Sequence, residues 1–151
     1  MELELPQGRL HHPILAVGAV ILKENRILLV QRRNPPYSGC WTIPGGKVKF
    51  GESTRDALVR EIKEECGLEV VPGRIIDVID HIEVSYDAPE VHYVIVDFYV
   101  ESFSGSLIAG SDAFDARWVD HSGLEDLQIP ELTRRFLEKH EILCQVCRNR
   151  A

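Results

Sequence analysis

One segment, residues 53–66, constrains the fold more than the rest of the chain because its sequence is typical of a well-delimited helix. Ser53 is a preferred N-terminal cap, and Asp56, three positions later, completes the pattern in which the cap and a first-turn side chain satisfy free backbone N–H groups. Gly67 follows as a typical C-terminal cap. The sequence therefore predicts one helix whose two ends are both specified locally.

One face of this predicted helix carries three carboxylates. At about 100° per residue, Glu61, Glu64 and Glu65 fall within an arc of roughly 100°. Leu58 and Ile62 lie beside that arc and can anchor the helix to a core. Three like charges so close repel one another unless a cation or solvent relieves them, and Mg²⁺ readily bridges carboxylates to phosphate oxygens. The pattern suits phosphate chemistry, although a solvated acidic face is the commoner role of such a helix.

The surrounding sequence, residues 46–68, resembles the Nudix box at every defined position. That pattern is Gly, five residues, Glu, seven residues, Arg-Glu, an aliphatic residue, any residue, Glu-Glu, any residue, Gly and an aliphatic residue. The matching positions are Gly46, Glu52, Arg60, Glu61, Ile62, Glu64, Glu65, Gly67 and Leu68. Fixed spacing over so many positions makes a chance match far rarer than for a short motif. The resemblance covers most of residues 14–140 and implies the Nudix fold, an α/β/α sandwich around a mixed β-sheet.

The resemblance also implies roles for individual residues. The metal ligands it implies are Glu61, Glu64, Glu65 and the backbone carbonyl of Gly45. Arg60 matches the arginine that holds a catalytic glutamate, and Glu52 matches the first glutamate of the box, a supporting group. Glu61 and Glu64 are therefore expected to be catalytic together with Arg60. In the family the general base is sometimes a box glutamate and sometimes an acid from a later loop, so the candidates are Glu61 first, then Asp112 or Glu90.

The expected substrate contacts are Arg32, Trp41 and Gly46. Arg32 resembles a substrate-phosphate contact of many members of the family. Trp41 and Tyr37 could stack on a nucleobase, although a Trp just before a Pro-Gly-Gly turn is at least as well suited to bracing that loop. His92 and Tyr93 lie on a strand that passes near the cleft in relatives, while a partly buried, hydrogen-bonded histidine is the ordinary alternative.

The remaining elements are predicted from periodicity and turn residues. Apolar runs at 14–22 and 27–30 flank a polar turn and predict a hairpin, and residues 74–84, 91–100 and 116–119 have strand composition. A last helix is expected near Pro130, with one face formed by Leu132, Phe136, Leu143 and Val146. This order predicts an α/β or α+β sandwich with one central mixed sheet. We expect an N-terminal segment of residues 1–12 and a single domain over residues 13–151.

Composition excludes several classes of partner. The 151 residues include 17 basic and 24 acidic side chains, a formal charge of -7, which argues against a nucleic-acid polymer as partner. The acidic N-terminus lacks a secretory signal pattern and no apolar run could span a bilayer, so we expect a cytoplasmic protein with no membrane partner. Cys144 and Cys147, with His140 upstream, are expected to be an incidental pair because a second pair of zinc ligands is missing.

These observations predict an enzyme that uses Mg²⁺, or Mn²⁺, to hydrolyse the phosphoanhydride of a nucleoside diphosphate derivative. Within the resemblance, the part after the box is similar to bacterial ADP-ribose pyrophosphatases, so ADP-ribose or a related nucleotide sugar is expected ahead of nucleoside triphosphates, oxidised purine nucleotides and dinucleoside polyphosphates. A homodimer is possible, as in many relatives. The alternative of another class is a non-catalytic Nudix module that senses a nucleotide; such modules typically have degraded metal ligands, whereas the box carboxylates here are intact.

Overall fold

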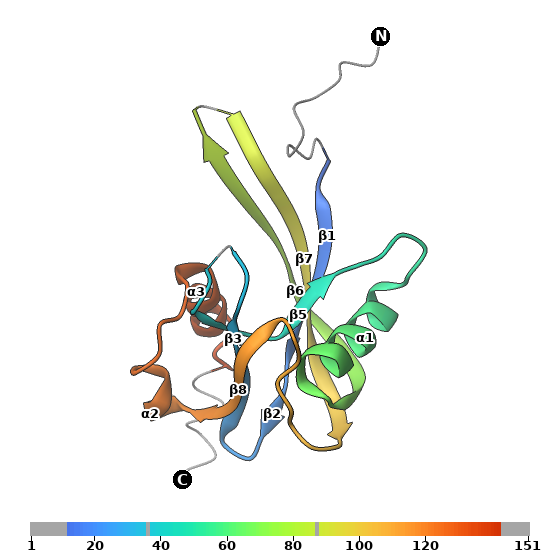
Figure 1. Cartoon of the computed structure of the whole chain (residues 1–151), viewed down its shortest axis with the longest axis vertical. Helices are drawn as coiled ribbons and strands as arrows, with labels where there is room; N and C mark the ends of the chain where they lie inside the picture. The colour runs from blue at the N-terminus through green and yellow to red at the C-terminus, as the bar shows by residue number, and fades with distance from the viewer. Residues whose placement is uncertain (1–11, 36, 87, 143–151) are drawn as a thin grey trace.

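The computed structural model describes residues 12–35, 37–86 and 88–142, which form β-sheets with helices on both sides. Figure 1 shows α1 (Thr54–Cys66) on one side of the strands and α2 (His121–Leu124) and α3 (Glu131–Lys139) on the other. The predicted α+β sandwich, with helices flanking a mixed sheet, is therefore confirmed. Among the helices of the described residues, none has the length and apolarity needed to cross a membrane.

The strands divide into two sheets rather than the single sheet expected. The first sheet has the order β5-β1-β7-β6, and its strands are β5 (Gly45–Lys47), β1 (Ile14–Val20), β7 (Ala88–Ser104) and β6 (Glu69–Ser85). It is mixed, because β1 runs parallel to β7 and the other pairs are antiparallel. In the second sheet β3 (Arg26–Arg32) pairs antiparallel with β2 (Leu22–Lys23), β4 (Trp41–Thr42) and β8 (Ala113–Asp120).

The division explains why the hairpin predicted for residues 14–22 and 27–30 is only partly present. Both edges of β1 are taken, one by β5 and the other by seven residue pairs with β7, so β1 has no edge left for β3. The chain passes from one sheet to the other at Ile21, and only the short β2 forms a hairpin with β3. Glu24 adopts a positive φ of 55° in the turn of that hairpin.

Two apolar clusters fill the space between the sheets and the helices. Val17 and Ala19 of β1 pack with the Leu58 and Ile62 side chains of α1, as predicted for this helix. Val20, one pleat away, packs instead with the cluster that holds the buried side chains of α2 and α3. Because β1 and β3 contribute to both clusters, their sequences are apolar runs rather than alternating patterns.

The β6 and β7 strands form a hairpin longer than predicted and extend beyond the rest of the fold (Figure 1). Each has 17 residues, so most of the loop expected at residues 85–90 is strand, with a turn at Tyr86. Pairing starts near the end of α1, at Glu69 with Ser104, and ends at Ser85 with Ala88. Where the hairpin pairs with β1, one of its faces borders the site described next.

The C-terminal elements close the other side of the molecule. Pro130 precedes α3, which confirms a helix start near this residue, and Phe136 is buried against the second cluster. The Nε2–H of His140 donates to the Asp77 carboxylate of β6 at 2.8 Å and thereby joins the end of α3 to the hairpin. Leu143, Cys144, Val146 and Cys147 lie outside the described residues.

Candidate active site

Local sequence fixes the position of the acidic helix. The Ser53 side chain accepts a hydrogen bond from the Asp56 N–H at 3.1 Å, and Gly67 ends α1 with a φ of 72° while its N–H donates to the Lys63 carbonyl. Lys63 points away from the acidic face and pairs with Glu69 at 2.9 Å. The predicted Ser53 and Gly67 caps and the facing of this helix are therefore confirmed, whereas the reciprocal hydrogen bond expected from the Asp56 side chain is not formed.

Arg60 links the carboxylates of this region to one another. Its Nε and Nη2 donate to the two oxygens of Glu52 at 2.7 and 2.8 Å, while Nη1 donates to Glu61 at 2.8 Å and to Glu64 at 3.2 Å. Nη2 also donates to the Lys47 carbonyl at 3.1 Å. The hydrogen bonds from Arg60 lower the pKa of Glu52 to about 2 and keep it ionised. Arg60 thus holds the loop before α1 against the helix and orients two box glutamates.

Two carboxyls of the helix lie in a partly desolvated environment. Burial, with repulsion from the nearby Glu61 and Asp112, raises the pKa of Glu65 to about 7, while a hydrogen bond from the Gly45 N–H at 3.0 Å opposes the shift. Burial likewise raises the pKa of Glu61 against the influence of Arg60, with Glu64 and Asp112 adding repulsion. Burial and mutual repulsion therefore both disfavour the ionised forms of these two carboxyls.

Gly46 is adapted to this arrangement. A Cβ built at this position would overlap the carboxylate of Glu61, so any larger residue would displace that side chain or the strand. β5 can therefore pass directly over the acidic face of α1. This close approach gives a structural reason for a glycine at the first position of the box.

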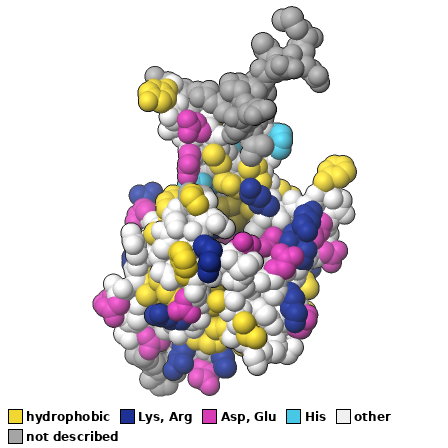
Figure 2. Space-filling view, viewed as in Figure 1, with side chains coloured by type: hydrophobic (Ala, Val, Ile, Leu, Met, Phe, Trp, Pro, Cys, Tyr) yellow, Lys and Arg dark blue, Asp and Glu magenta, His cyan; other side chains and the backbone are white. Residues whose placement is uncertain are grey.

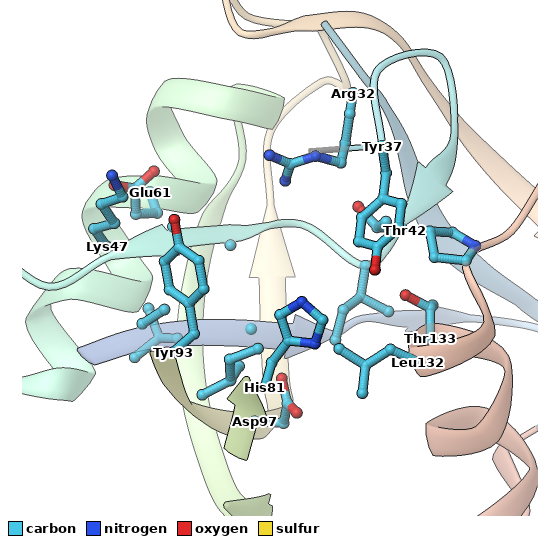
Figure 3. Close-up of a pocket in the computed structure, with 18 of the residues that line it drawn as sticks. Arg32, Tyr37, Thr42, Lys47, Glu61, His81, Tyr93, Asp97, Leu132 and Thr133 are labelled. Atoms are coloured by element: carbon cyan, nitrogen blue, oxygen red, sulfur yellow. The ribbon is translucent and has the colours of Figure 1, made fainter. Parts of the chain in front are cut away.

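A cleft of about 510 Å³ opens beside the acidic helix face. Figure 2 shows the surface hollowed at the base of the hairpin, with hydrophobic side chains in the hollow and charged side chains beside it. At one end the cleft is lined by Glu61, Glu64, Glu65 and Asp112. Farther along it is lined by Ile79, His81, Tyr93 and Ile95 of the hairpin and by Leu132, Thr133 and Phe136 of α3. Figure 3 shows Glu61 at one end, Leu132 and Thr133 at the other, and His81 and Tyr93 between them.

Most of the residues predicted for the site lie together at this cleft. They are Arg32, Gly45, Gly46, Glu61, Glu64, Glu65 and Asp112, and Tyr37 and Tyr93 line it as well. Glu52 stands behind them and is connected through Arg60. Residues from β3, β5, α1 and the segment before β8 thus converge on one volume although they are far apart in sequence.

The structure places three other candidates away from the cleft lining. Trp41 is 5% exposed and packs in the core, with the Arg117 guanidinium 4.9 Å from its ring centre, which favours the bracing role over contact with a base. Glu90 is exposed on β7 toward the tip of the hairpin. His92 pairs with Asp80 at 2.9 Å, which accounts for its imidazole without a substrate. None of the three is among the residues that line the described cleft.

Among the polar side chains that line the cleft and that sequence reasoning missed are Asp97 and His81. A signal for Asp97 was present, since it is a single acid within the otherwise apolar run of residues 94–100. An unpaired acid in a buried strand is rare and is often functional. For His81 the β6 pattern offered no comparable signal.

Comparison with known proteins identifies the family. Residues 12–140 match the family model of the NUDIX domain. The protein is a Nudix hydrolase. An ADP-ribose pyrophosphatase of Methanocaldococcus jannaschii is 38% identical over 125 residues, which cover 82% of this chain and 72% of that protein.

Two further Nudix proteins illustrate the range of relatives. An 8-oxo-dGTP diphosphatase of Proteus vulgaris is 31% identical over 94 residues, 62% of this chain and 80% of that protein. The crystal structure of a MutT NUDIX hydrolase from Burkholderia pseudomallei has a TM-score of 0.75 at 32% identity, and the match covers 85% of this chain and 98% of that one. The family and the hydrolase class predicted from the box are confirmed, and the non-catalytic alternative is set aside.

Proposed function

We propose that this Nudix hydrolase cleaves the phosphoanhydride of a nucleoside diphosphate derivative, with ADP-ribose or a related nucleotide sugar as its substrate class, in a reaction that depends on Mg²⁺ or Mn²⁺. The observation that carries the proposal is a single cleft that joins the acidic face of α1 to a compartment lined by apolar and aromatic side chains. A volume of about 510 Å³ lies in the range of small-molecule sites and suits one nucleotide.

The donor set at the acidic end has the chemistry that a hard divalent cation requires. Glu61, Glu64 and Glu65 supply carboxylate oxygens, and the Gly45 carbonyl is the additional oxygen ligand we assign. Repulsion among these carboxylates and Asp112 contributes to the raised pKa values, and a bound cation would relieve it. When bound, such an ion neutralises charge on phosphoryl oxygens and lowers the pKa of its water.

The carboxylates do not enclose an ion as they stand. Across the residues that the structure describes, no three acidic, histidine or cysteine side chains are arranged to hold a metal ion. The hydrogen bonds explain this, because Arg60 holds oxygens of Glu61 and Glu64 while the Gly45 N–H holds Glu65.

The protein's own groups can bind the phosphates and move the proton. Figure 3 shows the Arg32 guanidinium extending toward the Glu61 end of the cleft, where it would contact phosphate oxygens. Glu61 is the first candidate for the base that takes a proton from the attacking water. Its Oε2 is the oxygen for this step, since Oε1 accepts from Arg60. Asp112, which lines the same end, is the second candidate, and the position of Glu90 makes it the weakest.

The preference for ADP-ribose rests on the relatives and the shape of the site. The Methanocaldococcus jannaschii protein that matches 82% of the chain is an ADP-ribose pyrophosphatase, which supports a substrate with groups on both sides of the diphosphate. A nucleoside triphosphate is the second candidate, supported by the Proteus vulgaris 8-oxo-dGTP diphosphatase. Water would split ADP-ribose into AMP and ribose 5-phosphate, and a triphosphate into a monophosphate and pyrophosphate.

A product assay tests the proposal. The purified protein is incubated with Mg²⁺ and ADP-ribose, a nucleotide sugar, nucleoside triphosphates including 8-oxo-dGTP, and diadenosine polyphosphates, and the products are identified by chromatography. We expect AMP and ribose 5-phosphate at the highest kcat/KM, and no turnover with excess chelator. Higher kcat/KM on triphosphates would replace ADP-ribose by the second candidate, and turnover that persists in chelator would refute the metal dependence.

A further inference from the structure

Asp97 is an unusual residue for the centre of a sheet. It lies on β7 with 3% of its surface exposed, and it is the one charged side chain classed as buried in the described part of the chain. Its Oδ1 is enclosed and has no hydrogen-bond partner. Asp97 nevertheless lines the cleft, and Figure 3 shows it below His81 in the part of the cleft away from Glu61.

The surroundings of Asp97 disfavour a buried carboxyl, and no hydrogen bond or ion pair among the described residues offsets this. Burial, together with the charge of Asp77, its partner across the β6–β7 ladder, raises the pKa of Asp97 to about 7. The nearby cations are engaged by Asp77 instead, since Lys139 and His140 both contact that carboxylate. A buried polar group without a partner destabilises a protein, so the presence of an acid at this position calls for a functional explanation.

Neighbouring residues are shaped to admit this carboxyl. Gly18 of β1 is the parallel partner of Asp97, and a Cβ at Gly18 would overlap Oδ1. The same Cβ would lie 3.0 Å from Ile43 Cδ1, so the Asp97 carboxyl occupies the space that a side chain at Gly18 would fill. Gly18 and Ile43 both line the cleft, which places the carboxyl in its floor rather than in the sealed core.

The walls beside Asp97 favour a flat ligand with one polar edge. Ile79 and Ile95 form an apolar step on the hairpin, and the His81 and Tyr93 rings, which pair across the same ladder, continue it. Such walls would desolvate the hydroxyls of a sugar without replacing their hydrogen bonds, and an acid would repel a phosphate. A nucleobase has two apolar faces and a polar edge, so it matches one carboxyl set among apolar and aromatic walls.

We propose that Asp97 determines base specificity by accepting a hydrogen bond from the exocyclic amino group of a nucleobase bound in this part of the cleft, at the carboxyl oxygen other than the enclosed Oδ1. The inference rests on the proposed nucleotide hydrolysis and deepens it by naming the group that is read. Both the neutral and the ionised carboxyl present an acceptor oxygen to an amino group. Adenine, cytosine and guanine carry such an amine, whereas uracil and hypoxanthine do not.

Matched ligands and matched variants test this proposal. Binding of AMP, of purine riboside 5′-monophosphate, which lacks only the amine, and of 2′-deoxy-AMP is measured by chemical-shift titration, which reads millimolar affinities as well as tight ones. The variants are Asp97→Leu, and Gly18→Ala, which displaces the carboxyl while keeping it in the chain. The control is Asp80→Asn on the same hairpin, an exposed aspartate between Ile79 and His81 that faces away from the cleft.

For the wild-type protein and Asp80→Asn we expect AMP to bind on the order of tenfold or more tightly than the amine-free analogue, and about as tightly as 2′-deoxy-AMP. In Asp97→Leu and in folded Gly18→Ala the ratio of AMP to analogue should fall to about one. Equal wild-type binding with and without the amine would overturn the proposal, as would dependence on the 2′-hydroxyl instead. The binding titration does not depend on turnover. If the wild-type protein hydrolysed no phosphoanhydride, the proposed function would therefore be refuted separately from the proposal about Asp97.

Discussion

Replacing Asp97 by Asn should change the pH dependence of folding stability. The folded pKa of about 7 lies above the ordinary value of 3.8, so the folded state binds the proton more tightly than the unfolded chain does. The stability that protonated Asp97 contributes is therefore fully present below pH 3.8 and is lost as the pH rises toward about 7. Integrating this shift gives a loss of roughly 2 to 3 kcal/mol between pH 5 and pH 8.

Asn is isosteric and cannot ionise, so Asp97→Asn removes this contribution and little else. We expect the free energy of unfolding of the variant minus that of wild type to rise by about 2 kcal/mol or more between pH 5 and pH 8. Urea denaturation at both pH values, followed by circular dichroism, measures the difference, and titrations common to both proteins cancel. A difference that does not vary with pH would show that Asp97 keeps an ordinary pKa and would refute the reasoning.

Three further changes probe other parts of the site. Arg60→Lys keeps the charge, but a lysine cannot contact Glu52, Glu61 and Glu64 together. We expect kcat to fall by on the order of tenfold or more while the circular dichroism spectrum is retained. An unchanged kcat would contradict the orienting role of Arg60. Gly46→Ala should lower kcat because the added methyl group displaces Glu61. An unchanged kcat would contradict this reason for the glycine. Trp41→Ala should lower the free energy of unfolding by about 3 to 5 kcal/mol in urea denaturation. Trp41→Phe should leave KM for the substrate unchanged. A raised KM in a stable Trp41→Phe protein would instead support contact between Trp41 and the nucleobase.

The acidic helix could be predicted from sequence because its signals are local. Ser53, Asp56 and Gly67 specify both ends of α1, and the spacing of Glu61, Glu64 and Glu65 fixes their common face. The regular period of an α-helix carries such a pattern into space without knowledge of any other element. The three glutamates lie together at the cleft for this reason, whereas Arg32 and Asp112 come from distant segments and could be expected there only from the family resemblance.

Long-range pairing could not be predicted in this way. β1 pairs in parallel with β7 of the distant hairpin. No local feature of residues 14–22 indicates that this pairing is preferred over pairing with β3. Trp41 shows the same difficulty, because only the packing of α2 and α3 decides that its ring is enclosed. Asp97 was overlooked because strand composition dominates its surroundings, whereas the cleft that explains the acid forms only when β7, β1 and α3 come together.

We expect the acidic face of α1 to bind a divalent cation at the end of the nucleotide cleft, and the addition of Mn²⁺ tests this expectation most directly. Paramagnetic broadening of backbone amide signals should be strongest for residues 45–47 and 60–66 when Mn²⁺ is added. The Glu64→Gln and Glu65→Gln variants should lose this broadening and at least about 100-fold of turnover. The Glu69→Gln control, whose side chain pairs with Lys63 away from the cleft, should keep both. Broadening centred elsewhere, or unchanged in both glutamate variants, would contradict the account.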